Sequence, residues 1–100
     1  MIFEASDYRG YLKEYLLKLP KQGFGEGKRM AKHLGVSSTF ISQVLGGGKQ
    51  LSLEQAQELS EYLGHSELEA DYFFHLVQMD RAGTAKLKRL FQQKLLGDRG

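Results

Sequence analysis

The chain has 100 residues, of which 41% are hydrophobic, 26% are charged and only one is proline. This is the composition of an ordinary globular domain, and the length is too short for a multidomain enzyme. The absence of cysteine excludes disulfides, thiolate zinc sites and cysteine nucleophiles. The first residues do not resemble a secretory signal and no apolar run could span a bilayer, so we expect a cytoplasmic protein without a membrane partner.

The net charge is only +2, but it is distributed unevenly along the chain. Residues 1–20 are neutral, whereas residues 21–50 carry five basic side chains and one acidic side chain. Residues 51–71 carry six acidic side chains and no basic one, and residues 72–100 are basic again. The basic stretch in the middle of the chain is therefore a candidate surface for a polyanion.

Apolar residues recur with helical spacing almost throughout, and no segment alternates with a period of two, so we predict an all-α fold in one domain over residues 1–100. The six predicted helices cover residues 7–19, 28–34, 38–45, 53–63, 67–82 and 85–96. Pro20 ends the first helix and Gly35 the second, while Ser37 is the expected N-cap of the third. Ser52 and Ser66 are each followed three positions later by Gln or Glu, which predicts two capping boxes.

The second and third predicted helices are separated only by Gly35, Val36 and Ser37. Two short helices joined by such a turn form a helix-turn-helix, here at about residues 28–45, whose second helix can enter the major groove of DNA. We expect Val36, Ile41 and Val44 to point inward and to hold the third helix on the second. An outward polar face would then remain on the third helix.

The outward face supplies the residues predicted to read DNA bases: Ser38, Thr39, Ser42 and Gln43. Among them, Gln43 carries an amide that can bond adenine through two hydrogen bonds. The residues predicted to bind phosphate flank this face: Lys28, Arg29, Lys32, Ser37 and Lys49. The N-termini of the second and fourth helices would add amide donors, although Glu54 opposes this at the fourth.

The segment GKRMAKHLGVSSTFISQVLGGG resembles the helix-turn-helix of Cro/C1-type, or xenobiotic-response-element-type, bacterial and phage regulators. The resemblance covers about residues 27–64 and rests on the spacing of Ala31, Gly35, Val36, Ile41 and Val44. It implies a lambda-repressor-like bundle of five or six helices and a sequence-specific regulator of transcription, in the simplest mode a repressor. The flanks IFEASDYRGYL, LSLEQAQELSEYLG and LEADYFFHLVQMDRAGT resemble a paralogous bacterial family of regulators, in which such a domain usually precedes a longer, uncharacterised C-terminal region.

Two positions depart from the Cro/C1-type pattern. Gly27 stands where relatives often have a glutamine that contacts phosphate, so that Lys28 or Arg29 would have to substitute for it. Phe40 is large where many relatives have a small or polar residue. This ring could pack on its own core, touch a thymine methyl group or serve an interface, and we favour the core.

The mode of assembly follows from the size of the motif. A single helix-turn-helix reads only a few base pairs, and related proteins pair to read two half-sites about 34–36 Å apart, so we predict a homodimer. The amphipathic basic helix over 85–96 could close the core against the first helix, which we favour, pair with a second subunit, or lie on a membrane. We also expect one of four apolar residues of the fifth helix to lie at an interface rather than in the core: Phe73, Phe74, Val77 and Met79.

The alternative function is a protein-interaction module on the same helical frame, such as an antitoxin or the docking domain of a larger regulator. In that case Phe40 and Phe73 would contact the partner. The sequence contains no phosphate-binding loop and no serine elbow. Glu67, Asp71 and His75 share a helix face without zinc-ligand spacing. We therefore predict no catalytic residue, no metal site and no cofactor.

Overall fold

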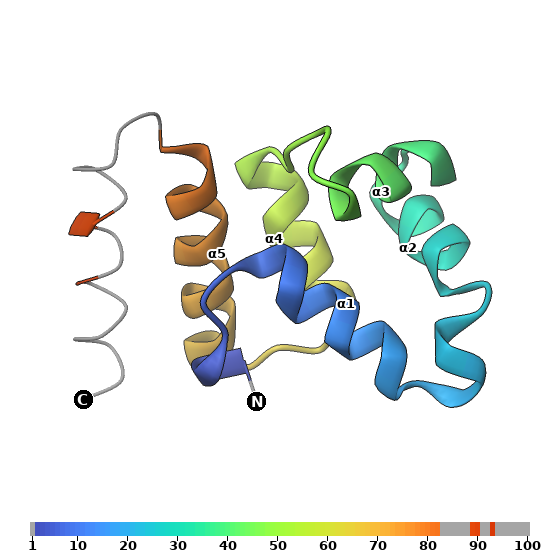
Figure 1. The fold of residues 1–100 in the computed structure, drawn as a ribbon, viewed down its shortest axis with the longest axis horizontal. Helices are drawn as coiled ribbons and strands as arrows, with labels where there is room; N and C mark the ends of the chain where they lie inside the picture. Colours follow the sequence, from blue (N-terminus) through green and yellow to red (C-terminus); the bar gives the residue numbers. More distant parts are fainter. Residues whose placement is uncertain (1, 83–88, 91–92, 94–100) are drawn as a thin grey trace.

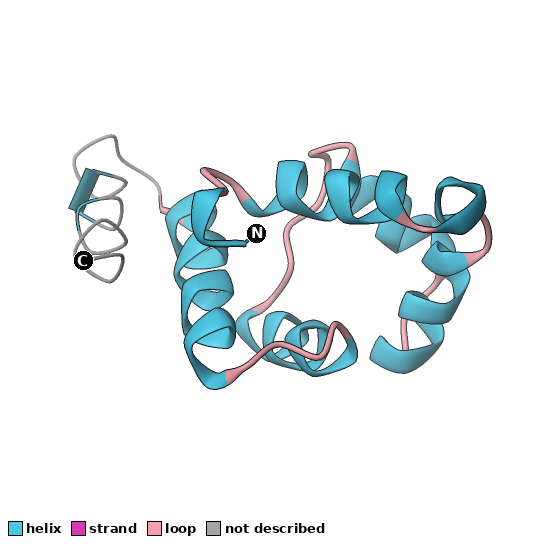
Figure 2. Ribbon diagram, turned by 90° about the horizontal axis from the view of Figure 1, so that it is seen from below, coloured by secondary structure: helices cyan, strands magenta, loops and turns pink. Residues whose placement is uncertain are grey.

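The computed structural model describes residues 2–82 together with Arg89, Leu90 and Gln93. In this part of the chain the secondary structure consists of α-helices and two short 3-10 helices, without a strand (Figures 1 and 2). The elements are η1 (Ile2–Glu4), α1 (Tyr8–Lys18), η2 (Pro20–Gly23), α2 (Glu26–Leu34), α3 (Ser38–Leu45), α4 (Leu53–Tyr62) and α5 (Glu67–Arg81). The predicted all-α fold is confirmed for these residues, and the helix predicted over 85–96 lies largely outside them.

Polar side chains cap the helices at the predicted positions. The carboxylate of Asp7 accepts a hydrogen bond from the Gly10 amide at 2.7 Å and starts α1. Ser37 caps α3, and Ser52 and Ser66 both form complete capping boxes at the starts of α4 and α5. Each of these caps satisfies a backbone amide that has no partner within its helix. The predicted capping boxes are therefore confirmed.

The start of α2 differs from the sequence prediction. The helix begins at Glu26, two residues earlier than expected, and its N-cap is Gly25 in the left-handed conformation, with a φ of 83°. Glycine adopts this conformation without strain, so the chain turns into the helix without a capping side chain. The short helix η2, which begins with Pro20, lies between the first two predicted helices and was not among the predicted elements.

The helices enclose one hydrophobic core, with α1 and α4 between α5 at one end and the pair α2–α3 at the other (Figure 1). The largest fully buried side chains come from every part of this arrangement: Tyr8, Phe73, Ile2, Met30, Leu51, Leu59, Leu76, Val44 and Val77. Ile41 and Val44 of α3 are buried, and Val36 in the turn is partly buried and packs against the hydrophobic core. The predicted inward face of α3 is confirmed.

The four apolar residues of α5 considered for an interface all contact the core, which corrects the expectation that they could not. Phe73 and Val77 are fully buried, and Phe74 and Met79 pack against the same cluster. The reason is that α5 is contacted by α4 and also by η1 and α1, so the core surrounds more than one side of it. Phe73 lies among the rings of Tyr8, Tyr11 and His65 and is not available to a partner.

Candidate nucleic-acid interface

The turn between α2 and α3 has a fixed backbone. The amide of Val36 donates to the carbonyl of Ala31 at 2.9 Å, and the amide of Gly35 donates to that of Lys32 at 3.3 Å. Gly35 has a φ of 71°, and a Cβ added there would meet no atom within 4 Å. The left-handed conformation, not a lack of space, therefore requires glycine at this position. With only three residues between the helices, α3 leaves α2 in one defined direction.

The outer face of α3, defined by Ser38, Thr39, Ser42 and Gln43, is exposed along its whole length. The opposite side of the helix carries Ile41 and Val44, which are 5% and 2% exposed. Because α3 is anchored by this apolar side, its outer face cannot rotate inward without opening the core. All four residues predicted to read bases thus share one exposed helical surface.

Ser37 combines a structural role with a free donor. Its hydroxyl oxygen accepts the amide hydrogen of Phe40 at 3.0 Å and caps α3. A serine hydroxyl can accept this bond and still donate its own hydrogen to another oxygen, so the cap does not prevent a phosphate contact. The ring of Phe40 is half-buried and packs against the core, which is the role favoured from the sequence.

The predicted phosphate-binding cations all lie on the surface near α3. Lys28, Arg29 and Lys32 are exposed on α2, and Lys49 is exposed on the loop that follows α3. Arg29 forms an ion pair with Glu26 at 3.0 Å, whereas within the described residues the three lysines join no salt bridge. The lysines therefore offer their full charge to an external anion, and Arg29 offers only part of its hydrogen-bonding capacity.

Glu26 explains why α2 begins where it does. Its side chain is almost buried, with 8% of the residue exposed, and its carboxylate accepts a hydrogen bond from the hydroxyl of Tyr62 on α4. A second bond comes from Arg29 Nε at 3.1 Å. The Tyr62 hydrogen bond, followed by the bond and charge of Arg29, lowers the pKa of Glu26 below its usual value. A negative charge in the first turn of a helix also interacts favourably with the helix dipole. The hydrogen bond from Tyr62 fixes α2 on α4.

The N-terminal ends of α2 and α4 are not equivalent as anion sites. Gly25 has no side chain with which to cap the first amides of α2. In α4, Ser52 already takes the amide of Gln55 at 3.0 Å, and the exposed Glu54 adds negative charge to the first turn. Both first turns contain a carboxylate, but that of Glu26 is buried and bonded to Tyr62 and Arg29, so the end of α2 is the less unfavourable of the two for a phosphate oxygen.

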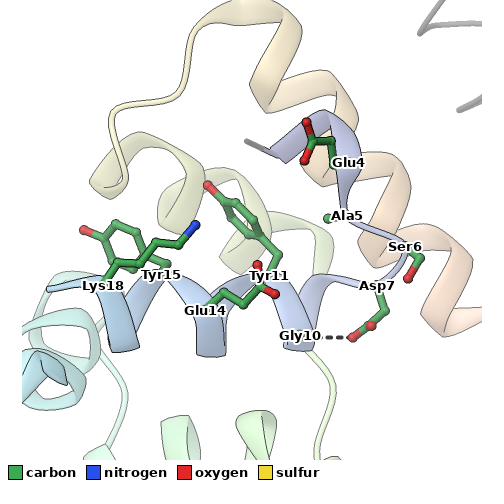
Figure 3. Close-up of a pocket in the computed structure, with 9 residues that line it drawn as sticks. All are labelled: Glu4, Ala5, Ser6, Asp7, Gly10, Tyr11, Glu14, Tyr15 and Lys18. Carbon is green, nitrogen blue, oxygen red and sulfur yellow. Dashed lines mark hydrogen bonds between the residues drawn. The ribbon is translucent and has the colours of Figure 1, made fainter.

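Two clefts among the described residues carry more acidic than basic side chains. A cleft of about 390 Å³ runs along α1 and is lined by three acidic side chains (Glu4, Asp7 and Glu14), by one cation, Lys18, and by Tyr11 and Tyr15 (Figure 3). A second cleft, of about 290 Å³, lies between α4 and α5 and includes Glu61 and Asp71. Negative charge in both clefts disfavours a nucleic-acid backbone there. The convex surface of α2 and α3 is the better candidate interface.

One polar cluster was not predicted from the sequence. His65 lies between α1 and α4: its Nδ1 is 2.8 Å from the hydroxyl of Ser60, and its Nε2 is 2.8 Å from the hydroxyl of Tyr11. Burial lowers the pKa of His65, so its neutral form is favoured in the folded protein. The signal in the sequence was faint: Tyr11 and Ser60 are polar side chains at helical positions otherwise occupied by core residues.

Further observations bear on other classes of protein. No helix among residues 2–82 is long and apolar enough to cross a membrane. In the same part of the chain, no three metal-binding side chains are grouped closely enough to hold an ion. Family models, curated proteins and solved structures were compared with the chain, and none of them matches it.

Proposed function

We propose that the protein is a sequence-specific double-stranded DNA-binding regulator of transcription with a lambda-repressor-like fold of the Cro/C1 type. In this proposal α2 and α3 form the helix-turn-helix, and α3 is the recognition helix. The observation that carries the proposal is the division of α3 into a buried apolar side and an exposed polar side, next to unpaired lysines on α2. This division is what insertion of a helix into the major groove requires.

Base reading would fall to the outer face of α3. The amide of Gln43 can bond adenine N6 and N7 at once, whereas the hydroxyls of Ser38, Thr39 and Ser42 bond bases with less preference. Lys28, Lys32 and Lys49 would meet phosphates on either side of the groove, assisted by Arg29 and by the hydroxyl of Ser37. The phosphate contacts set the register, and the amide of Gln43 contributes most of the discrimination.

A single helix of eight residues spans too few base pairs to define a unique genomic site. A homodimer doubles the number of bases that are read, and its two-fold symmetry requires an inverted repeat with half-sites about 34–36 Å apart. Occlusion of a promoter by such a dimer is the simplest regulatory action. The proposed protein is therefore a dimeric repressor.

Selection of bound duplexes from a randomised pool tests the proposal, followed by titration of the enriched duplex over a range of salt concentrations. We expect a short inverted repeat, and the logarithm of the affinity should fall with the logarithm of salt at about −0.9 per phosphate neutralised. Recovery of no common sequence, with equal binding to all duplexes, contradicts sequence-specific regulation.

The second candidate is a protein-interaction module, such as an antitoxin or the docking domain of a larger regulator. It is favoured by the exposure of two apolar side chains near the connection of α1 to α2: Phe24 is 85% exposed and Leu17 63%. A partner that covered them would bind with little dependence on salt. Weak, salt-insensitive enrichment in the selection, together with loss of partner binding in Phe24→Ser, would favour this second function.

A further inference from the structure

Arg9 connects three parts of the fold that are distant in sequence. It lies in the first turn of α1, and its side chain is only 16% exposed. Its Nε donates to the carbonyl of Val44 at 2.7 Å, and its Nη2 to the carbonyl of Lys49 at 2.8 Å. Its Nη1 donates to Asp80 Oδ1 at 2.6 Å, and the guanidinium carbon lies 4.8 Å from the centre of the Tyr8 ring. One planar group thus joins the end of α3, the following loop and the last turn of α5.

The loop after α3 is held both by its own backbone hydrogen bonds and by Arg9. It contains three consecutive glycines, at 46–48, which have more conformational freedom than any other residues. The amides of Gly48 and Lys49 fold back onto the carbonyl of Gln43, at 2.9 and 3.2 Å, and that of Gly47 onto Val44 at 3.1 Å. The Val44 carbonyl therefore accepts from the loop and from Arg9 together. Arg9 closes this end of α3 from the opposite side.

We propose that Arg9 is a positioning residue for base reading, which holds the C-terminal end of α3 and the loop bearing Lys49 in one arrangement against α5. The inference rests on the proposed DNA binding. Arg9 lies outside α2 and α3 and reaches the recognition helix only through its backbone. Arg9 fixes the position of Gln43 relative to Lys49. Gln43 can then contact its base while Lys49 contacts the phosphate.

The geometry requires arginine. The three bonds come from three nitrogens at fixed angles in one plane, and the acceptors belong to three separate elements. A lysine at this position would keep the positive charge near Asp80, but its single nitrogen could not reach the carbonyls of both Val44 and Lys49 in the same directions. The Arg9→Lys variant therefore separates geometry from charge.

The test compares Arg9→Lys with Lys18→Arg, a control exchange of the same kind at an exposed position of the same helix. The first measurement, without DNA, is hydrogen exchange at the amides of Gly47, Gly48 and Lys49. The second is the affinity for the selected duplex divided by that for a random duplex. We expect exchange about tenfold faster in Arg9→Lys and a ratio about tenfold lower, with no change in the control.

Each outcome decides the proposal. Unchanged exchange in Arg9→Lys refutes the ordering of the loop, and faster exchange with an unchanged ratio refutes the role in base reading. If Arg9→Lys does not fold, Asp80→Ala removes the acceptor of only one of the three contacts and should move both measurements in the same direction by a smaller factor. Equal binding of both duplexes by the unaltered protein refutes the proposed function itself, while the exchange rates still report separately on the loop.

Discussion

The outer face of α3 and the cluster around His65 use polar side chains in opposite ways. Around His65, the hydroxyls of Tyr11 and Ser60 meet the two ring nitrogens, so polar groups inside the protein satisfy one another. On α3, the side chains of Ser42 and Gln43 are exposed, and the helix is held by its apolar side and by the bond from Arg9 to the Val44 carbonyl. The first region uses its polar groups within the fold, whereas the second leaves them exposed, as the proposed DNA binding requires.

This difference separates stability from recognition within one small domain. Substitutions around His65 should change the free energy of unfolding and leave the intrinsic contacts with DNA intact. Substitutions on the outer face of α3 should do the reverse. Arg9 belongs to neither region, and in the proposal it affects base reading through the backbone at the end of α3.

The largest effect is expected from Phe73→Ala, beside His65. Removal of a fully buried phenylalanine leaves a cavity and should lower the free energy of unfolding by about 3–5 kcal/mol. Urea titration measures the loss, and binding to the selected duplex, measured where the variant is still folded, should be nearly unchanged. A stable variant with weakened DNA binding would mean that the two regions are not separate.

Gln43→Ala tests the opposite region. We expect it to weaken binding to the selected duplex by about 1–3 kcal/mol and to relax the preference at one base position, because the bidentate amide contact is lost. The free energy of unfolding should stay within about 0.5 kcal/mol of the original, since the side chain is exposed. Equal weakening on all duplexes would remove Gln43 from the set of reading residues.

The lysines of α2 should contribute to DNA affinity independently of the base sequence. Lys28→Ala should weaken binding to every duplex and reduce the steepness of the salt dependence by about 0.9, the value for one phosphate contact. Lys18→Ala removes the same charge from the acidic cleft on α1 and is the matched control. A salt dependence that changes equally in both variants would show that only net charge matters.

A change of pH tests the His65 cluster. Burial lowers the pKa of His65 in the folded state, so the unfolded chain takes up the proton first as the pH falls. The contribution of the cluster is complete above the unfolded pKa of about 6.5 and declines from there down to the folded pKa. Urea titrations at about pH 7.5 and about pH 5.5 should show a loss of stability that is reduced in His65→Gln. The same loss in both proteins would assign the pH dependence to other groups.

The smallest effect is expected from Gly27→Gln, which introduces the glutamine that Cro/C1-type regulators often have at this position. A Cβ at this position would lie 4.0 Å from Ile41 Cγ2, an ordinary van der Waals distance. Replacement of a helical glycine should raise the free energy of unfolding by about 0.5 kcal/mol. The added amide should also strengthen binding to all duplexes slightly. Weaker binding would indicate that the DNA backbone approaches too closely for a side chain.

The helices and the α3 surface could be predicted because their signals are local. Ser52 and Ser66 each form a capping box with the residue three positions later, which predicts the start of a helix. Gly35 predicts the turn because glycine adopts the left-handed conformation that the turn requires. The outer face of α3 follows from helical periodicity once Ile41 and Val44 are placed inward. These inferences need only residues that are close together in the chain.

The remaining features depend on contacts across the fold. Arg9 finds partners 35, 40 and 71 positions away, and Glu26 meets Tyr62 across 36 positions. No local pattern distinguishes such a side chain from a solvated one. The prediction for Phe73 was wrong for the same reason: helical periodicity assumes one neighbouring surface, whereas α5 packs against several elements.

The division of α3 into two sides has a consequence for the diversification of such proteins. Four side chains on its outer surface can be exchanged without altering the residues that hold the helix in place. Under the proposed function, single substitutions at these positions in a duplicated gene would change the base preference without altering the buried side of the helix. A library randomised at these positions, on an otherwise constant scaffold, should consist mostly of folded members.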